Sequence, residues 1–181
     1  MTQAPWHPHE DYDIRGNGVR WDDLKFPFTQ TPLGALSTPD FDFTNIGLLF
    51  PQNDATEIIY IIGQLPHARQ LGSPLKPHIH WRQSANTPVK WVLEYKICNN
   101  GEVPPVSFTK LESTETTFDY TAGITQITPL GTIDGANITL SSILLMKVYR
   151  DDNTTTGDVL GYEMDIHYQI DSRGSRREFV K

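Results

Sequence analysis

Residues 161–171 read GYEMDIHYQID, and the pattern of this segment decides the fold. Large apolar side chains stand at the even positions from 162 to 170, and polar ones stand at 163, 165, 167 and 169. Successive side chains of a strand point to opposite faces. One face of this segment is therefore apolar and the other polar, which is typical of an antiparallel sheet with one buried side.

The segment before it is also apolar. Residues 143–149 read ILLMKVY, and the polar stretch 150–158 separates them from residues 161–171. Short apolar runs bounded by turn residues indicate strands. We expect the two segments to form a long hairpin, or two neighbouring strands, at the centre of a β-sandwich.

Further strands are predicted by the same criteria at 45–51, 56–64, 77–83, 89–98, 106–111 and 124–130. The continuous run at 58–62 predicts a strand buried on both faces, and Pro129 predicts that its own strand lies at a sheet edge. With 13 Gly and 13 Pro, the composition favours turns and strands over helices. We predict an all-β fold, an antiparallel, jelly-roll-like β-sandwich of about eight strands over residues 45–181.

Residues 1–44 differ from the rest of the chain. They contain several prolines and scattered aromatic residues without a sustained period, which indicates an extended N-terminal arm. Exposed aromatics would form an apolar patch, so we expect the arm to pack on its own domain or on a neighbouring subunit. We predict interface anchors at Trp21, Phe26 and Phe28, and we expect deletion of residues 1–40 to leave a folded sandwich that assembles poorly.

Composition narrows the classes of partner. The net charge of −7 over 181 residues argues against nucleic acid, because binding phosphates requires a basic surface. Cys98 is the single cysteine, so no disulfide forms within the chain. No apolar run approaches the ~20 residues of a membrane span and no signal peptide is visible, so we expect no membrane contact and synthesis in a bacterial cytoplasm.

The candidate chemistry lies in three histidines. His78 and His80 are two apart on a predicted strand and leave the same face, and Asp165 and His167 share the polar face of residues 161–171. Imidazole and carboxylate groups suit a transition metal, so His78, His80 and His167 are the candidate metal ligands. We favour the simpler interpretation, in which these histidines form hydrogen bonds on a polar or subunit-facing surface and no cofactor is bound. A third hypothesis places one histidine per subunit in a ring at a trimer axis.

Two resemblances extend this interpretation. Gly72 followed by His78–His80 resembles the opening of the first cupin motif, but residues 82–86 read RQSAN and lack the expected glutamate, and the second motif is absent. The stretches 21–27 (WDDLKFP), 76–81 (KPHIHW), 89–95 (VKWVLEY), 131–135 (GTIDG) and 165–176 (DIHYQIDSRGSR) together resemble a family of uncharacterised tailed-bacteriophage and prophage proteins. That resemblance implies a virion structural component built as a β-sandwich on the head or tail, without catalysis.

Three functions follow as hypotheses. The first is a non-enzymatic structural protein of a bacteriophage virion, in head decoration or in the neck or tail, which contacts other virion proteins and forms a homo-oligomer, with a trimer favoured. The alternative is a cupin-like metal-dependent enzyme that uses the three histidines. A further alternative is a carbohydrate-binding module, because jelly rolls are common among lectins.

Overall fold

The structure, a computed structural model, describes residues 20–30, 38–51, 54–85, 88–113, 122–151 and 157–171. Its elements are ten strands and one short 3₁₀ helix, η1 (Phe28–Gln30). The remainder of the predicted arm, at 1–19 and 31–37, lies outside the described residues, as do residues 172–176 of the C-terminal motif. The described residues contain no helix with the length and apolar character that crossing a membrane requires.

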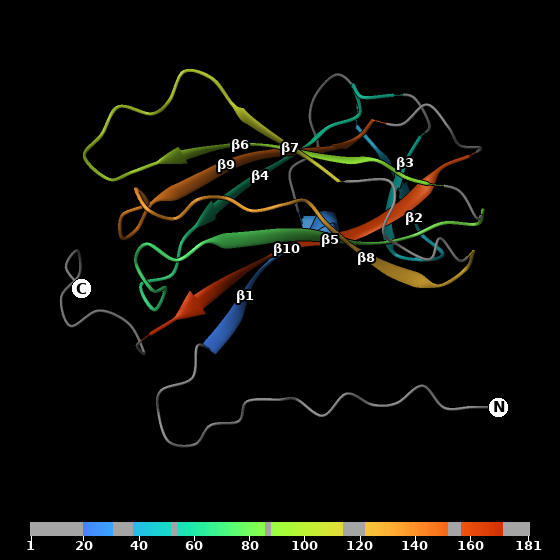
Figure 1. Cartoon of the computed structure of the whole chain (residues 1–181). Helices are drawn as coiled ribbons and strands as arrows, with labels where there is room; N and C mark the ends of the chain where they lie inside the picture. The colour runs from blue at the N-terminus through green and yellow to red at the C-terminus, as the bar shows by residue number, and fades with distance from the viewer. Residues whose placement is uncertain are drawn as a thin grey trace.

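The strands form two antiparallel sheets that face each other (Figure 1). The first sheet contains β1 (Arg20–Pro27), β2 (Asp40–Asp42), β3 (Gly47–Phe50), β5 (Leu75–Arg82), β8 (Thr125–Pro129) and β10 (Val159–Ile170). The second sheet contains β4 (Ile59–Gln64), β6 (Trp91–Cys98), β7 (Thr109–Glu112) and β9 (Ile143–Arg150).

The strand order is that of a jelly roll. In the first sheet the order is β2-β3-β10-β5-β8, and in the second it is β4-β9-β6-β7. From β3 onward the chain crosses repeatedly from one sheet to the other, so neighbours in the sequence mostly lie in opposite layers. The predicted jelly-roll-like sandwich is confirmed, and all eight predicted strands are present. β8 ends the first sheet, as Pro129 indicated.

The predicted hairpin of residues 143–171 is wrong. β9 pairs with β4 and β6, whereas β10 pairs with β1, β3 and β5. Each strand is central in its own sheet; β9 ends at Arg150 in the second sheet, and β10 begins at Val159 in the first. Both strands still carry an apolar face, because both sheets bury one side in the shared core.

A chain of aromatic rings runs through this core. The ring centroids of Phe28 and Phe50 are 5.7 Å apart, those of Phe50 and Trp91 are 5.0 Å apart, and those of Trp91 and Trp81 are 6.2 Å apart. All three pairs are edge-to-face, an arrangement that aromatic quadrupoles favour. Gly161 lies beside this chain, where an added Cβ would come within 2.8 Å of the rings of Phe28 and Phe50. Any other residue at position 161 would therefore require the two phenylalanine rings to move.

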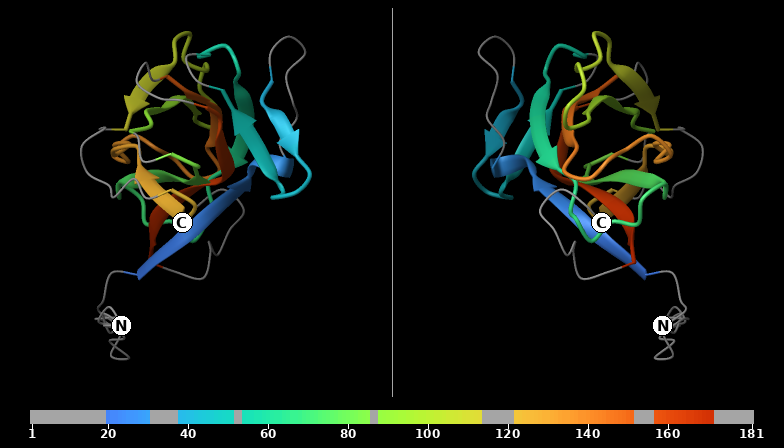
Figure 2. Two further views of the ribbon diagram at one scale, coloured as in Figure 1. Left: turned by 90° about the vertical axis from the view of Figure 1, so that its right-hand side faces the viewer. Right: turned by 90° about the vertical axis from the view of Figure 1, so that its left-hand side faces the viewer.

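Part of the predicted arm belongs to this sandwich. All eight residues of β1 pair antiparallel with β10, and Figure 2 shows β1 in blue lying along β10 in red. Phe28, predicted to anchor an interface, is fully buried in the core of its own chain, so that prediction is wrong for Phe28. Phe26 packs at the edge of the core over Gly63, and Trp21 remains 41% exposed. The sequence missed β1 because only Leu24 and Phe26 in it face the core.

Candidate metal centre

The candidate ligands come from two neighbouring strands of the first sheet. β5 and β10 pair antiparallel, with His78 opposite Asp165 and His80 opposite Glu163. On β5 the alternate residues Ile79 and Trp81 are fully buried in the core. Because side chains alternate between faces, the two histidines project from the outer face of the sheet, and Asp165 does the same on β10. The predicted parity of these residues is therefore correct.

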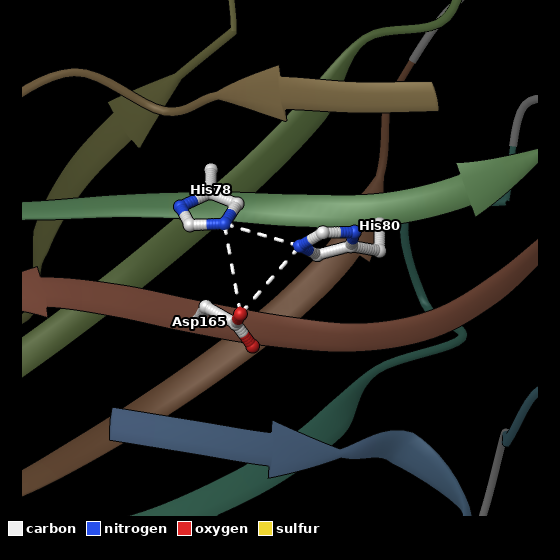
Figure 3. A group of neighbouring side chains, drawn as sticks. All are labelled: His78, His80 and Asp165. Carbon is white, nitrogen blue, oxygen red and sulfur yellow. Dashed lines mark hydrogen bonds and ion pairs between the residues drawn. The ribbon is translucent and has the colours of Figure 1, made fainter. Parts of the chain in front are cut away.

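Three ligand atoms converge on this face (Figure 3). The Nε2 atoms of His78 and His80 are 3.1 Å apart, and Asp165 Oδ2 lies 3.7 Å from the first and 3.5 Å from the second. Within the described part of the chain, these are the side chains whose type and spacing could hold a metal ion. Two imidazoles and one carboxylate make a donor set typical of zinc and other late first-row metals.

Burial controls the charges of this cluster. Burial of His78 lowers its pKa to about 4, and the nearby His167 and His80 act in the same direction. Burial also raises the pKa of Asp165, which the neighbouring His80 and Lys25 oppose. At neutral pH His78 is therefore an uncharged imidazole, so its contact with Asp165 is not an attraction between two full charges.

His167, the third predicted ligand, lies beside the cluster but is directed elsewhere. Its ring is 4.5 Å from the ring of His78, centroid to centroid, in an edge-to-face arrangement. Its Nε2 atom is 2.9 Å from Oδ1 of Asp23, which stands opposite it on β1. The structure thus brings together His78, His80 and Asp165 in place of the predicted set of three histidines. Register places Lys76, and not a histidine, opposite His167 on β5.

The cluster lies in an open depression of the outer face, with a volume of about 590 Å³. Strands β1, β5, β8 and β10 line it, with side chains that include Lys25, Lys76, Ile127, Thr132 and Glu163. Trp21 stands on the same face of β1, where the ammonium of Lys76 lies 4.7 Å from the centre of its ring. The site is therefore open to solvent and separate from the interior that Trp81 and Trp91 fill.

A second surface feature lies where the two sheets meet along their edges. An apolar groove of about 420 Å³ is lined by Phe26 and Pro27 on one side and by Tyr60, Ile61 and Ile62 on the other. β4 was predicted to be buried on both faces, but it alternates, so Tyr60 and Ile62 are exposed. A uniformly apolar run does not reveal that one of its faces is uncovered, so the sequence did not predict this groove.

Comparison with known proteins adds little. No protein-family model and no curated protein matches the sequence. Among solved structures, the CBM36-1 domain of a multidomain xylanase from the hindgut metagenome of Trinervitermes trinervoides has a TM-score of 0.45 at 12% identity, over 80% of this chain and 96% of that chain. A CBM36 carbohydrate-binding module in complex with calcium and xylotriose has a TM-score of 0.43 at 12% identity, over 79% and 98%.

A viral protein of similar architecture is VP2 of infectious bursal disease virus, in its subviral particle. Its TM-score is 0.45 at 7% identity, over 86% of this chain and 34% of that chain. Likenesses at this level lie in the layering of strands alone.

Proposed function

We propose that the chain is a non-enzymatic structural protein of a bacteriophage virion, in head decoration or in the neck or tail, and that it acts by assembling with copies of itself. The observation that carries the proposal is the apolar groove between β1 and β4. Ile62 is 74% exposed and Tyr60 is 46% exposed, and both line it. Exposed apolar patches of this kind mark interaction sites on soluble proteins.

The groove lies between two sheet edges. Among the described strands, β4 pairs with β9 alone and β1 pairs with β10 alone. Natural proteins usually protect a free strand edge with charges or prolines, or cover it with another segment. On the β1 side Lys25 and Pro27 line the groove, whereas the β4 side presents Tyr60, Ile61 and Ile62. A covering partner accounts for both the free edges and the exposed apolar area.

The same chain carries a segment that suits the groove. The β6–β7 loop exposes Val103 and Val106, which are 91% and 93% exposed and flank Pro104 and Pro105. Proline-rich segments dock into aromatic-lined grooves at a low entropic cost, because their backbone is already extended. We therefore assign the groove of one subunit to the β6–β7 loop of the next. Such a contact joins two different surfaces and forms a ring when the rotation from one subunit to the next closes. The ring we expect is a trimer.

Charge reversal at this contact provides the test. Ile62→Lys and Val103→Glu are each expected to weaken trimer formation at least about tenfold, because each buries an unpaired charge. The double variant is expected to recover assembly, because the two new charges then pair. Ile124→Lys, at an exposed apolar residue away from the groove, is the matched control and should remain a trimer. Light scattering coupled to gel filtration measures the mass of each protein.

Three results would each contradict one part of the proposal. A stable oligomer should form at a protein concentration of tens of micromolar. A wild-type protein that is monomeric at this concentration would therefore contradict self-assembly. Absence of the chain from purified particles of the phage that encodes it, measured by mass spectrometry, removes the virion role. A double variant no better than its single variants removes the assigned contact between the groove and the β6–β7 loop.

Carbohydrate binding is a second candidate function, which Trp21 favours. Its exposed ring stands on the same outer face as the depression, and Asp23 lies two residues further along the same strand. Sugars stack on such rings and bond to such carboxylates. A glycan array should give binding that Trp21→Ala removes and Val106→Ala retains. An array without binding, or binding that is unchanged in Trp21→Ala, would contradict it.

The geometry does not favour the cupin-like enzyme. His78 and His80 face away from the space between the sheets, and side chains such as Trp81 and Trp91 fill that space. The Nε2 atom of the predicted third histidine, His167, instead contacts Asp23 Oδ1 at 2.9 Å. These observations support the non-enzymatic interpretation.

A further inference from the structure

We propose that His78, His80 and Asp165 bind one divalent transition-metal ion, with zinc as the preferred occupant, on the outer face of the first sheet. The proposal does not depend on self-assembly, because all three side chains belong to adjacent strands of one chain. It also differs from the predicted set, because Asp165 replaces His167.

The first argument is the spacing of the ligand atoms. Zinc binds histidine nitrogen and carboxylate oxygen at about 2.0 to 2.1 Å, so neighbouring ligands of a tetrahedral ion lie about 3.3 to 3.4 Å apart. Here the three separations are 3.1, 3.5 and 3.7 Å. Shifts of a few tenths of an ångström would bring all three atoms into bonding distance of one ion.

The second argument is the unsatisfied carboxylate. Asp165 is buried, and its Oδ1 atom has no hydrogen-bond partner among the described residues. A buried carboxylate with an unpaired oxygen is costly unless a cation or donors compensate it. The Oδ2 atom lies 3.5 and 3.7 Å from the two Nε2 atoms, which is longer than an ordinary hydrogen bond. A divalent cation bound by Oδ2, the oxygen that faces the two histidines, compensates the charge of this carboxylate.

The third argument is the support behind His78. Its ring is hydrogen-bonded to the backbone of Lys76 while Nε2 points at the cluster. A metal-bound histidine almost always uses its second ring nitrogen in this way, which fixes the orientation of the ring. Lys76 lies two residues before His78 on the same strand, so β5 alone fixes the orientation of the His78 ring.

The donor set selects the metal. Two imidazoles favour zinc, copper, nickel or cobalt over calcium and magnesium, which prefer oxygen ligands alone. The fourth position of a tetrahedral ion opens on the depression, where water completes the coordination. We therefore expect zinc with three protein ligands and one exchangeable ligand.

Calorimetry on the full chain tests the site. After dialysis against a chelator and its removal, titration with zinc chloride should give one equivalent per chain with micromolar affinity or tighter. His80→Ala and Asp165→Asn should each lower the affinity at least about 100-fold, since each removes a direct ligand. His80 is the histidine of choice because its side chain is 23% exposed, against 9% for His78, and its removal leaves the core intact, which circular dichroism verifies. Cobalt should give the strong visible absorption of a tetrahedral ion.

Two control variants distinguish the zinc site from a site that includes His167 and from the proposed self-assembly. His167→Gln removes the adjacent imidazole and should keep one equivalent of zinc, and an equal loss there would overturn the assigned ligands. The Ile62→Lys variant should bind zinc as wild type does, so a failure of self-assembly does not mimic a failure of this site. If the wild-type protein is not saturated at millimolar zinc, the proposal is overturned. The three side chains would then form only a hydrogen-bonded cluster.

Discussion

Deletion of residues 1–40 is expected to abolish cooperative folding, although the sequence pattern predicted a sandwich that survives this cut. The deletion removes β1, which pairs with β10 along its whole length, and it removes Phe28 from the centre of the core. Loss of one buried phenylalanine costs about 3 to 5 kcal/mol by itself. A domain of this size has only about 5 to 15 kcal/mol in total. The loss of Leu24 and Phe26 from the same strand adds to the deficit.

A shorter deletion is the matched control. Removing residues 1–19 takes away none of the residues that the structure places in the sandwich, so it should leave the urea midpoint close to that of the full chain. Phe28→Ala in the full chain should lower the free energy of unfolding by about 3 to 5 kcal/mol. Urea unfolding followed by far-ultraviolet circular dichroism measures all three. A cooperative transition of unchanged midpoint after deletion of residues 1–40 would show that β1 is dispensable.

The strand predictions rested on strands with one apolar face and one polar face. In β10 apolar and polar side chains alternate from Tyr162 to Ile170, so alternation alone identified it. Alternation specifies the face of a side chain but not the partner of its strand. The same pattern therefore fits a hairpin of β9 and β10 and the observed placement in separate sheets, since both bury identical faces.

β1 shows why the N-terminal boundary was misjudged. Its outer face carries Trp21, Asp23 and Lys25, and its inner face meets the core mainly through Leu24 and Phe26. An edge strand with few core contacts has a weak apolar period, so the sequence suggested an irregular arm. Its assignment to the sheet comes from pairing with β10, which is remote in sequence.

The candidate metal centre was predictable in part. Spacing by two put His78 and His80 on one face, and the same rule put Asp165 and His167 on one face. Which of the latter pair meets the histidines depends on the register between β5 and β10. That register sets Asp165 opposite His78 and Lys76 opposite His167. No local feature of either strand encodes this choice, so the sequence could name the group but not the three ligands.

Arg69 carries the other large expected effect, and nothing in the sequence pattern singled it out. The side chain is almost fully buried, and its guanidinium donates to three backbone carbonyls, those of Gln70, Ser73 and Ile138. The first two belong to the loop before β5, and the third belongs to the loop before β9. Arg69 therefore joins two long connections at one end of the sandwich. Burial lowers the pKa of Arg69, and the charge of Asp171 opposes that change.

Arg69→Ala is expected to lower the free energy of unfolding by about 3 to 5 kcal/mol, because it leaves buried carbonyls without donors and opens a cavity. Arg69→Lys should recover little, since a single ammonium cannot reproduce the planar fork that reaches both loops. Arg82→Ala is the control: Arg82 is partly exposed, its contact with Asn45 is 3.5 Å long, and the change should stay within about 0.5 kcal/mol. Urea unfolding measures the three values. Equal losses for Arg69→Ala and Arg82→Ala would mean that water replaces the guanidinium at these carbonyls, and the two loops would then be held by their backbone contacts alone.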